Sequence, residues 1–357
     1  MKRQLYILGG TLFTLFLSGC SNGTLPLPEE EGERIPITFS ASGVSVGTEV
    51  QTKADTKAFP HGGSIAIVAA HATQSTPDWS NLFMNHVKAT ANTTTDADNY
   101  IVTTDDNTTY YWPFNPTEYL SFAAYSPAIN GSGNESVSKT SGKNTALDVK
   151  TPFPDLLYSS HTDCWNKSHG TVALTQFQHA MAKVKVIVKC VKYNNENAEI
   201  DYSNADITIS SLSIGTKVTT GKFDFQAPAW TLQTPAGDAI ATTLYTLITG
   251  GSSKMTKAYE STGDYYLLPN TTSTNVADNS VINITLKDKS GSYPYTKNIS
   301  DFKVSGGGNA SLVMGKITTL TIKIKVMDVE SGSTDGIVLK GDLTDWVDKG
   351  NSTVVIE

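Results

Sequence analysis

Short runs with an apolar side chain at every second position recur along this chain, and they restrict its fold more than any other feature. In residues 182–191, Val184, Val186 and Val188 would share one face, and residues 317–326 alternate in the same way. A period of two is typical of a β-strand that buries one face. Further predicted strands are residues 35–46, 65–70, 110–112, 120–125, 171–174, 207–214, 264–268 and 281–286.

The segments between these runs are rich in Asn, Thr, Gly and Ser, as in residues 92–99 and 130–144, and are predicted to be loops. Helical patterns are nearly absent, and the best of them is the short segment 82–88. Strands without intervening amphipathic helices favour β-sandwiches over a parallel α/β sheet. We therefore predict an all-β protein, and the length of 357 residues indicates two sandwich domains, 35–172 and 173–357.

The first residues have the pattern of an export signal. Lys2 and Arg3 precede an apolar stretch over residues 5–17, which ends in Leu17-Ser-Gly-Cys20. A basic start, an apolar run too short for a stable span and small residues before a cleavage site are typical of a signal peptide. We predict that residues 1–19 are removed and that Cys20 carries a lipid that holds the exported chain to a membrane. The alternatives are an ordinary signal peptide with a chance cysteine, or a short membrane anchor.

Charge and composition describe the mature chain further. Removal of Lys2 and Arg3 moves the formal net charge from −7 to −9. An acidic surface argues against a nucleic-acid partner. Residues 20–34 combine Pro, Gly and an acidic run without periodicity, and therefore predict a flexible tether between the lipid and the fold.

Cysteine and histidine are too sparse to predict a metal site. His161, Cys164 and His169 lie close together in sequence, whereas His179 and Cys190 are far away along the chain. A structural zinc site needs about four ligands in compact pairs, so solvated loop residues are the favoured interpretation. Cys164 and Cys190 could pair in an oxidising compartment, but one disulfide cannot replace hydrophobic cores in a chain of this size.

Motifs of catalysis are also missing from the sequence. It contains no nucleophile elbow, phosphate loop, zinc-protease helix or dinucleotide fingerprint. We therefore predict no catalytic residue, no metal and no cofactor. The five tryptophans are expected to be mainly core residues of β-sandwiches, although a sugar-binding platform among them is an alternative; they are Trp79, Trp112, Trp165, Trp230 and Trp346.

The distribution of arginine points to a processing site. Arginine occurs only at Arg3 and Arg34, and Arg34 stands between the tether and the first predicted strand. Flexible segments are the ones that proteases bind in extended form. Lys53 and Lys57 follow that strand, and a cut there would separate the strand from the rest of the chain. The alternative is that Arg34 and these lysines are ordinary solvent-facing residues.

Several motifs together resemble the fimbrillins, the pilus and fimbria-like lipoproteins of the Bacteroidales. The resemblance covers nearly the whole chain, and the motifs occur in the family's order. They are the lipobox at Cys20, Ile35-Pro-Ile-Thr-Phe-Ser40, Thr52-Lys-Ala54, Tyr111-Trp-Pro-Phe114, Tyr119-Leu-Ser-Phe-Ala-Ala-Tyr-Ser-Pro127, Asp155-Leu-Leu-Tyr158, Phe177-Gln-His-Ala-Met-Ala-Lys-Val184, Tyr266-Leu-Leu-Pro269 and Trp346-Val-Asp-Lys-Gly350.

The resemblance implies two tandem transthyretin-like β-sandwiches and a lipoprotein that travels to the outer membrane and then becomes part of a cell-surface fimbrium. It also implies proteolytic removal of the first strand and its replacement by a strand of another fimbrial subunit, in support of adhesion to a host or bacterial surface. On this chain, cleavage would fall at Arg34 or Lys53. The displaced strand would present Ile35, Ile37, Phe39, Ala41, Val44 and Val46, and the donor strand would present Val354, Val355 and Ile356.

Two features depart from a simple stalk subunit. Cleavage at Arg34 would free the chain from its lipid without opening a groove, and the segment after Trp346 is short for a donor strand. A tip, accessory or anchor subunit of the same pilus is therefore an alternative. A monomeric glycan-binding lipoprotein of the outer membrane is a second, and a glycan hydrolase with scattered carboxylates is a third.

Overall fold

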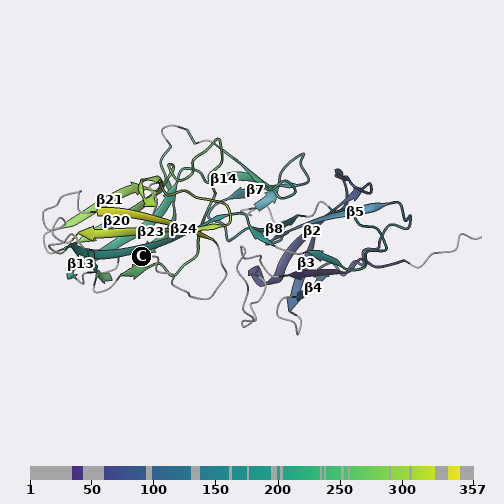
Figure 1. Ribbon diagram of the computed structural model, residues 1–357, viewed down its shortest axis with the longest axis horizontal. Coiled ribbons are helices and arrows are strands. Elements are labelled where there is room, and N and C mark those ends of the chain that lie inside the picture. The colour runs from purple at the N-terminus through teal and green to yellow at the C-terminus, as the bar shows by residue number, and fades with distance from the viewer. Residues whose placement is uncertain are drawn as a thin grey trace, which may run out of the picture. The chain divides into compact units, whose positions relative to one another are not determined.

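The structure is a computed structural model, and almost all of its regular elements are strands (Figure 1). It describes residues 34–42, 60–93, 99–129, 137–160, 163–174, 177–193, 199–201, 204–233, 235–236, 239–250, 253–255, 258–288, 291–304, 308–325 and 337–345. Within these ranges the only helical elements are the 3-10 turns η1 (Pro60–Gly63) and η2 (Ile299–Asp301). The prediction of an all-β protein is confirmed. The described residues from Ile35 onward form one compact unit.

An eight-stranded sheet contains most of the strands of the first half of the chain, in the order β10-β8-β5-β2-β3-β4-β1-β9. Every neighbouring pair in it is antiparallel except β1 and β9, which are parallel. Its strands are β1 (Phe39–Ser42), β2 (Ser64–Ala72), β3 (Pro77–Thr93), β4 (Asn99–Thr104), β5 (Tyr119–Ser126), β8 (Leu157–Ser160), β9 (Val172–Leu174) and β10 (Gln178–His179).

The central strand β2 explains why this sheet separates two cores. Ile65, Ile67 and Ala69 enter one hydrophobic cluster, while Ala66 and Val68 enter another. All five are at most 1% exposed. Because both faces of the strand are buried, its sequence is a nearly continuous apolar run rather than an alternating one.

The helical interpretation of residues 82–88 is wrong. These residues lie inside β3, which pairs with β2 along most of its length and with β4 at its end. Register shifts between β2 and β3 bend the strand, and His86 takes a φ of 51°. Pairing with β2 and burial of Met84 outweigh the weak preference of residues 82–88 for helix.

A four-stranded sheet covers the second face of the eight-stranded sheet, in the order β15-β14-β7-β6. It joins β6 (Val137–Lys139) and β7 (Ala146–Lys150) to β14 (Thr220–Asp224) and β15 (Ala229–Leu232). Strands β7 and β14 lie side by side in Figure 1, and they pair over five residues. Aromatic rings link the two sheets, with centroids 5.5 Å apart for Tyr125 and Phe225 and 5.0 Å apart for Tyr158 and Phe223.

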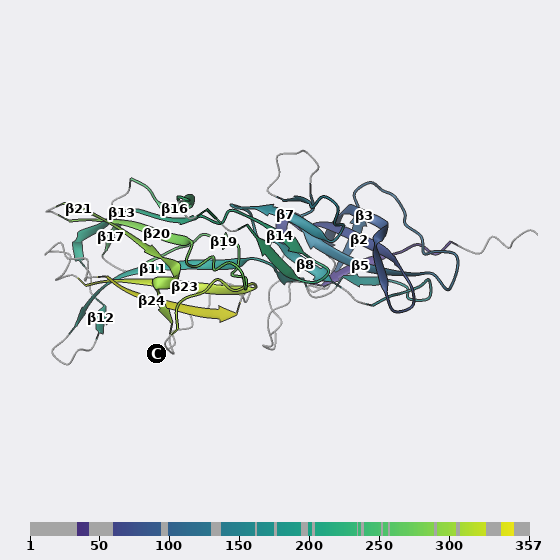
Figure 2. The same cartoon turned by 90° about the horizontal axis from the view of Figure 1, so that it is seen from above.

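The second half of the chain forms a further β-sandwich. One sheet has the order β12-β11-β23-β24-β22, with β18 and β19 also paired to β11, and the other has the order β16-β13-β20-β21, with β17 paired to β13. Figure 2 shows β11, β23 and β24 in one layer and β13, β16, β20 and β21 in the other. Their bounds are β11 (Ala182–Tyr193), β12 (Glu199–Asp201), β13 (Asn204–Thr216), β16 (Thr242–Ile248), β17 (Ser253–Met255), β18 (Tyr259–Glu260), β19 (Tyr265–Leu267), β20 (Ser280–Lys287), β21 (Ser292–Asn298), β22 (Lys303–Val304), β23 (Lys316–Lys325) and β24 (Ile337–Asp345).

The core of this sandwich follows from the alternation in the sequence. Val184, Val186 and Val188 of β11 are fully buried and share a cluster with Leu212 and Ile214 of β13. The two-domain division at residues 172 and 173 stays a prediction. Strand β9 spans that position, and β14 of the second half completes a sheet of the first half through its pairing with β7.

Candidate functional site

The first strand of the fold occupies an interior position of the eight-stranded sheet. Strand β1 lies between β4, with which it is antiparallel, and β9, with which it is parallel. Ile37, Phe39 and Ala41 are 7%, 5% and 1% exposed, whereas Thr38 is exposed. The alternation of apolar and hydroxyl residues thus gives the strand one buried face. We call the surface that β1 covers, formed by β4, β9, Trp112 and Phe122, the first-strand seat.

Backbone hydrogen bonds hold residues 35–38 before β1 begins. The amide of Ile37 donates to the carbonyl oxygen of Tyr110 over 2.7 Å, and the amide of Trp112 donates to that of Ile35 over 2.9 Å. On the other side, the amide of Val172 donates to the carbonyl oxygen of Thr38 over 2.8 Å. The segment therefore satisfies hydrogen-bonding groups on both of its neighbours, which water would have to solvate if the segment left.

An aromatic box receives the side chain of Phe39. Its ring meets Phe122 edge to face with centroids 5.6 Å apart, and Phe122 in turn contacts Trp112 at 5.9 Å and Trp165 at 6.0 Å. Trp165 is fixed by paired backbone hydrogen bonds with Leu120. Edge-to-face ring pairs add about 0.5–1.5 kcal/mol beyond the burial of their area.

The seat would be exposed if β1 were lost. Among the described strands, β9 pairs only with β1, so it would lose its place in the sheet. Val102, Val172 and Leu174, all buried beside β1, would face solvent. Burial of a large apolar side chain stabilises a protein by about 1.5–3 kcal/mol, so an empty seat strongly favours a new strand.

The other residues predicted for strand exchange fall in different places. Arg34 is exposed, immediately before the segment that enters the sheet, and Ile35 is 39% exposed rather than buried. The remaining predicted positions lie outside the described residues; they are Cys20, Val44, Val46, Lys53, Val354, Val355 and Ile356.

The residues considered for a metal site are not gathered. Within the described part of the chain, no group of three or more His, Cys, Asp or Glu side chains is placed to hold a metal ion. His169 stacks on Trp165 at 4.5 Å, and His161 lies outside the described residues. Cys190 is a buried free thiol, so it forms no disulfide with Cys164.

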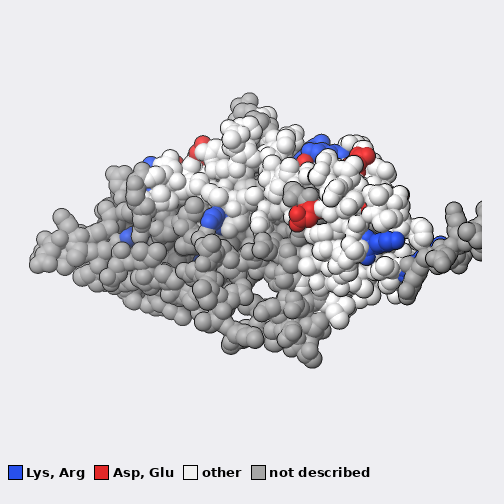
Figure 3. Space-filling view, turned by 45° about the vertical axis from the view of Figure 1, so that its right-hand side comes forward, with Lys and Arg blue, Asp and Glu red and all other residues white. Residues whose placement is uncertain are grey.

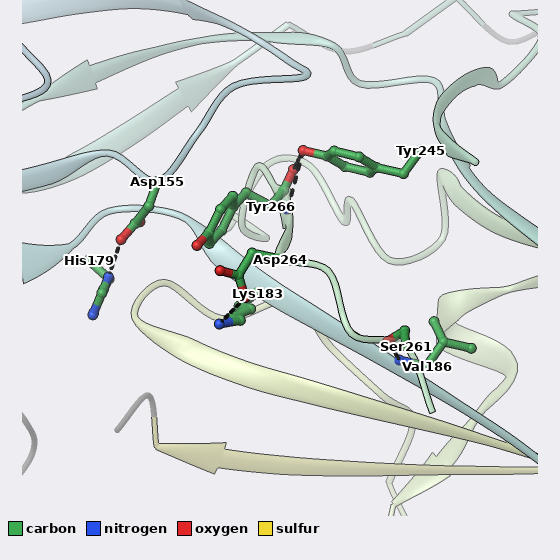
Figure 4. A network of polar contacts seen from close by, with 8 residues as sticks. All are labelled: Asp155, His179, Lys183, Val186, Tyr245, Ser261, Asp264 and Tyr266. Carbon is green, nitrogen blue, oxygen red and sulfur yellow. Dashed lines mark hydrogen bonds and ion pairs between the residues drawn. The ribbon is translucent and has the colours of Figure 1, made fainter. Parts of the chain in front are cut away.

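A buried polar pair that the sequence did not predict joins β10 to the loop before β8. His179 Nδ1 lies 2.5 Å from Asp155 Oδ2, and the two side chains are 4% and 7% exposed (Figure 4). Both residues belong to motifs that carry the family resemblance, but nothing in their spacing in the sequence indicates contact. Because both side chains are buried, we interpret the pair as a structural link between these two segments.

A second set of polar contacts fixes an edge of the C-terminal sandwich. Lys183 Nζ pairs with Asp264 at 2.5 Å, and the hydroxyl of Tyr245 donates to the carbonyl oxygen of Tyr266 over 2.9 Å (Figure 4). The amide of Val186 donates to Ser261 Oγ over 2.9 Å. The contacts of Lys183 and Val186 bind the β18–β19 segment to β11, and the Tyr245 contact ties the same segment to β16 of the other sheet. The segment thereby covers an edge of β11, and an uncovered edge is a template for unwanted strand pairing.

The aromatic surface offers little support for a tryptophan platform. Trp112 and Trp230 are buried, and Trp79 and Trp165 are half-buried against the cores, while Trp346 lies outside the described residues. The exposed aromatic side chains among the described residues are Tyr111 and Phe114, with Lys167 over the Phe114 ring at 5.1 Å.

Charged side chains are scattered over the coloured part of the face in Figure 3 and do not form one patch. No helix of the described residues is long and apolar enough to cross a membrane.

Comparison with known proteins identifies the family. The sequence profile of the fimbrillin-like family matches residues 52–346. The chain belongs to the fimbrillin-like family. This confirms the resemblance seen in the sequence motifs, and it makes the chain a member of a family of structural fimbrial and adhesion proteins of the cell surface. No curated protein matches it in sequence.

Two crystal structures share the fold of this fimbrillin-like chain. One is a candidate cell adhesion protein from Bacteroides uniformis ATCC 8492, at 17% identity and a TM-score of 0.52, with 87% of this chain and 98% of that one covered. The other is a fimbrial protein from Bacteroides vulgatus ATCC 8482, at 16% identity and a TM-score of 0.52, with coverages of 87% and 99%. Both likenesses support the β-sandwich assignment.

Proposed function

We propose that this fimbrillin-like chain is a structural subunit of a cell-surface fimbrium that is exported as a lipoprotein and assembled by strand exchange. In this proposal Cys20 carries the lipid and anchors the precursor in the outer membrane. Cleavage after the first strand then removes residues 35–46, and a strand of another subunit fills the first-strand seat. The chain's own residues 353–356, with Val354, Val355 and Ile356, serve as the donor strand for a neighbour.

The observation that carries the proposal is the position of β1. It is the first strand of the described fold and it pairs on both edges. Its Phe39 and Ala41, together with Ile37 just before it, place three buried side chains in a core. A strand of this kind that remained covalently attached through residues 43–59 would keep the seat filled. One cut in that connection converts it into a removable peptide, which is the requirement for β-strand addition by a partner.

The site of the cut decides between maturation and mere release from the lipid. A cut after Arg34 leaves β1 attached to the rest of the fold, whereas a cut after Lys53 separates it. The mature sequence from Cys20 onward contains a single arginine, Arg34, so an arginine-specific protease has one site there. The double variant R34K/K53R moves that single site to the far side of the strand without changing any charge.

The experiment compares these two proteins after digestion with an arginine-specific protease. We expect the cut R34K/K53R protein to form polymers that increase with protein concentration, as measured by light scattering and electron microscopy, and deletion of residues 353–357 to abolish them. The cut wild-type protein should remain monomeric. If the cut double variant also stays monomeric at high concentration and retains its first strand, the strand-exchange proposal is wrong.

The glycan-binding alternative has one observation in its favour. Phe114 is 64% exposed and carries Lys167 over its ring, an arrangement that could stack against a sugar. Loss of binding to a polysaccharide in a Phe114→Ala variant, with the first strand still in place, would support that function over assembly. A tip or anchor subunit would instead accept or donate a strand on one side only.

A further inference from the structure

The first-strand seat restricts the direction of any strand that fills it. Phe39 pairs with Val102 of antiparallel β4 and with Val172 of parallel β9. A strand in the reverse direction would be parallel to β4 and antiparallel to β9. Both hydrogen-bond ladders would then change their spacing, because parallel and antiparallel bonds have different geometries. The seat therefore favours an incoming strand that runs in the direction of β1.

The seat also restricts the size of three inward side chains. Ile37 occupies the first position, and Phe39 fills the aromatic box of Phe122 and Trp112 at the second. Ala41 occupies the third position at 1% exposure, so a larger side chain there would have to displace buried neighbours. Loss of the Phe39 ring would leave a cavity that the surrounding aromatic side chains could close only in part.

The order of these sizes fixes the register. A slip of one residue turns Thr38 and Ser40 inward and the apolar residues outward. A slip of two residues in either direction brings Phe39 to a position that now holds Ile37 or Ala41. The outward face adds a polar contact, because the hydroxyl oxygens of Thr38 and Thr171 lie 2.8 Å apart.

We infer that the seat accepts a strand of a partner subunit with the pattern aliphatic–x–aromatic–x–small, running in the direction of β1. This inference rests on the proposed function and specifies its partner. The occupant seen in the structure, Ile37-Thr-Phe-Ser-Ala41, is the template for it. Residues 353–357 of a second copy offer Val354 and Ile356 on one face and no aromatic residue. Exchange between identical copies is therefore the weaker reaction and occurs at high concentration only.

The test uses the full mature R34K/K53R protein, cut with the arginine-specific protease and exchanged against fluorescent peptides. The reference peptide has the sequence of residues 35–46. Its variants carry Phe39→Ala, Ala41→Phe and the matched control Ser40→Ala on the opposite face. A reversed sequence and a peptide of residues 352–357 complete the set, and binding is followed by fluorescence polarisation.

We expect the reference and the Ser40→Ala peptide to bind within about twofold of one another, since a surface substitution changes the free energy little. The Phe39→Ala peptide and the peptide of residues 352–357 should bind on the order of 100-fold more weakly, because both lack the aromatic ring and leave a cavity. The Ala41→Phe peptide should be weakened on the same order, because its added ring overfills a packed site. The reversed peptide should not compete.

Three outcomes would overturn the inference, and they separate it from the proposed function. If the reference, Phe39→Ala and Ala41→Phe peptides bind equally, the seat can be refilled but does not select for the side chains at its inward positions. In that case only the inference fails. If residues 352–357 bind as tightly as the reference, the preferred occupant is a second copy and the inference likewise fails. If no peptide enters, including the reference, the seat cannot be vacated and the proposed function fails with it.

Discussion

His86 should make the stability of this protein depend on pH below neutrality. Its imidazole is half-buried in β3, where Nδ1 lies 2.9 Å from the hydroxyl of Tyr125 and the ring packs edge-on against Phe225. Burial, together with the positive charge of Lys139, lowers the pKa of His86 from 6.5 to about 4. The folded state therefore holds the imidazole neutral.

The sign and size of the effect follow from linkage. Between pH 6.5 and pH 4 the unfolded chain binds a proton at His86 that the folded chain does not, so the free energy of unfolding falls as the pH is lowered through this window. One pKa unit corresponds to about 1.4 kcal/mol. The free energy of unfolding should therefore fall by about 2 kcal/mol between pH 7.5 and pH 5 if solvent screening is ignored. Since His86 is only partly buried, screening reduces this loss to roughly 1–2 kcal/mol. The contribution of His86 is fully present above pH 6.5.

Urea unfolding at pH 7.5 and pH 5 measures this loss, and His86→Asn is the matched control. Asparagine tolerates the φ of 51° at this position and does not titrate. The pH-dependent loss should be about 1–2 kcal/mol larger in the wild type than in His86→Asn, because contributions of the other groups cancel in the comparison. Equal losses in the two proteins would refute the reasoning.

Three further substitutions or probes test the packing. Gly63→Ala should lower the free energy of unfolding by roughly 1–3 kcal/mol, since Gly63 has a φ of 78° and an added Cβ would lie 2.4 Å from the carbonyl oxygen of Ala91; an unchanged urea midpoint would contradict this. Asp155→Ala should cost about 1.5–3 kcal/mol by removing a buried hydrogen bond to His179, whereas a variant as stable as the wild type would assign the pair no structural role. Burial raises the pKa of Cys190 to about 11, so at pH 8 a thiol reagent should modify it only on unfolding; rapid modification of the native protein would show that the thiol is accessible.

The strand content of the fold could be predicted because alternation reports directly on one-sided burial. The pattern of β11 placed Val184, Val186 and Val188 on one face, and all three are fully buried. The prediction for β3 failed because residues 82–88 have no strong period, and their pairing with β2 decides their conformation. Local sequence carries no information about such a tertiary neighbour.

Partners along the sheets were beyond the reach of sequence for the same reason. Alternation gives a strand a buried face but not a neighbour, so neither the parallel pairing of β11 with β23 nor that of β1 with β9 was predictable. The seat itself was partly predictable. The alternating residues Ile37, Phe39 and Ala41 were assigned to the first strand from the sequence. The aromatic box that receives Phe39 comes from Trp112, Phe122 and Trp165. These rings follow the three strand residues by 71 (Ala41 to Trp112) to 128 (Ile37 to Trp165) positions in the chain.

The most direct measurement of the central claim is the N-terminal sequence and intact mass of this subunit in fimbriae purified from the cell surface. The account predicts a subunit that begins after residue 53, so that β1 is absent from its own seat. A subunit that begins at Ile35, or that retains lipidated Cys20, would keep β1 in the assembled fibre and would contradict assembly by strand exchange at this site.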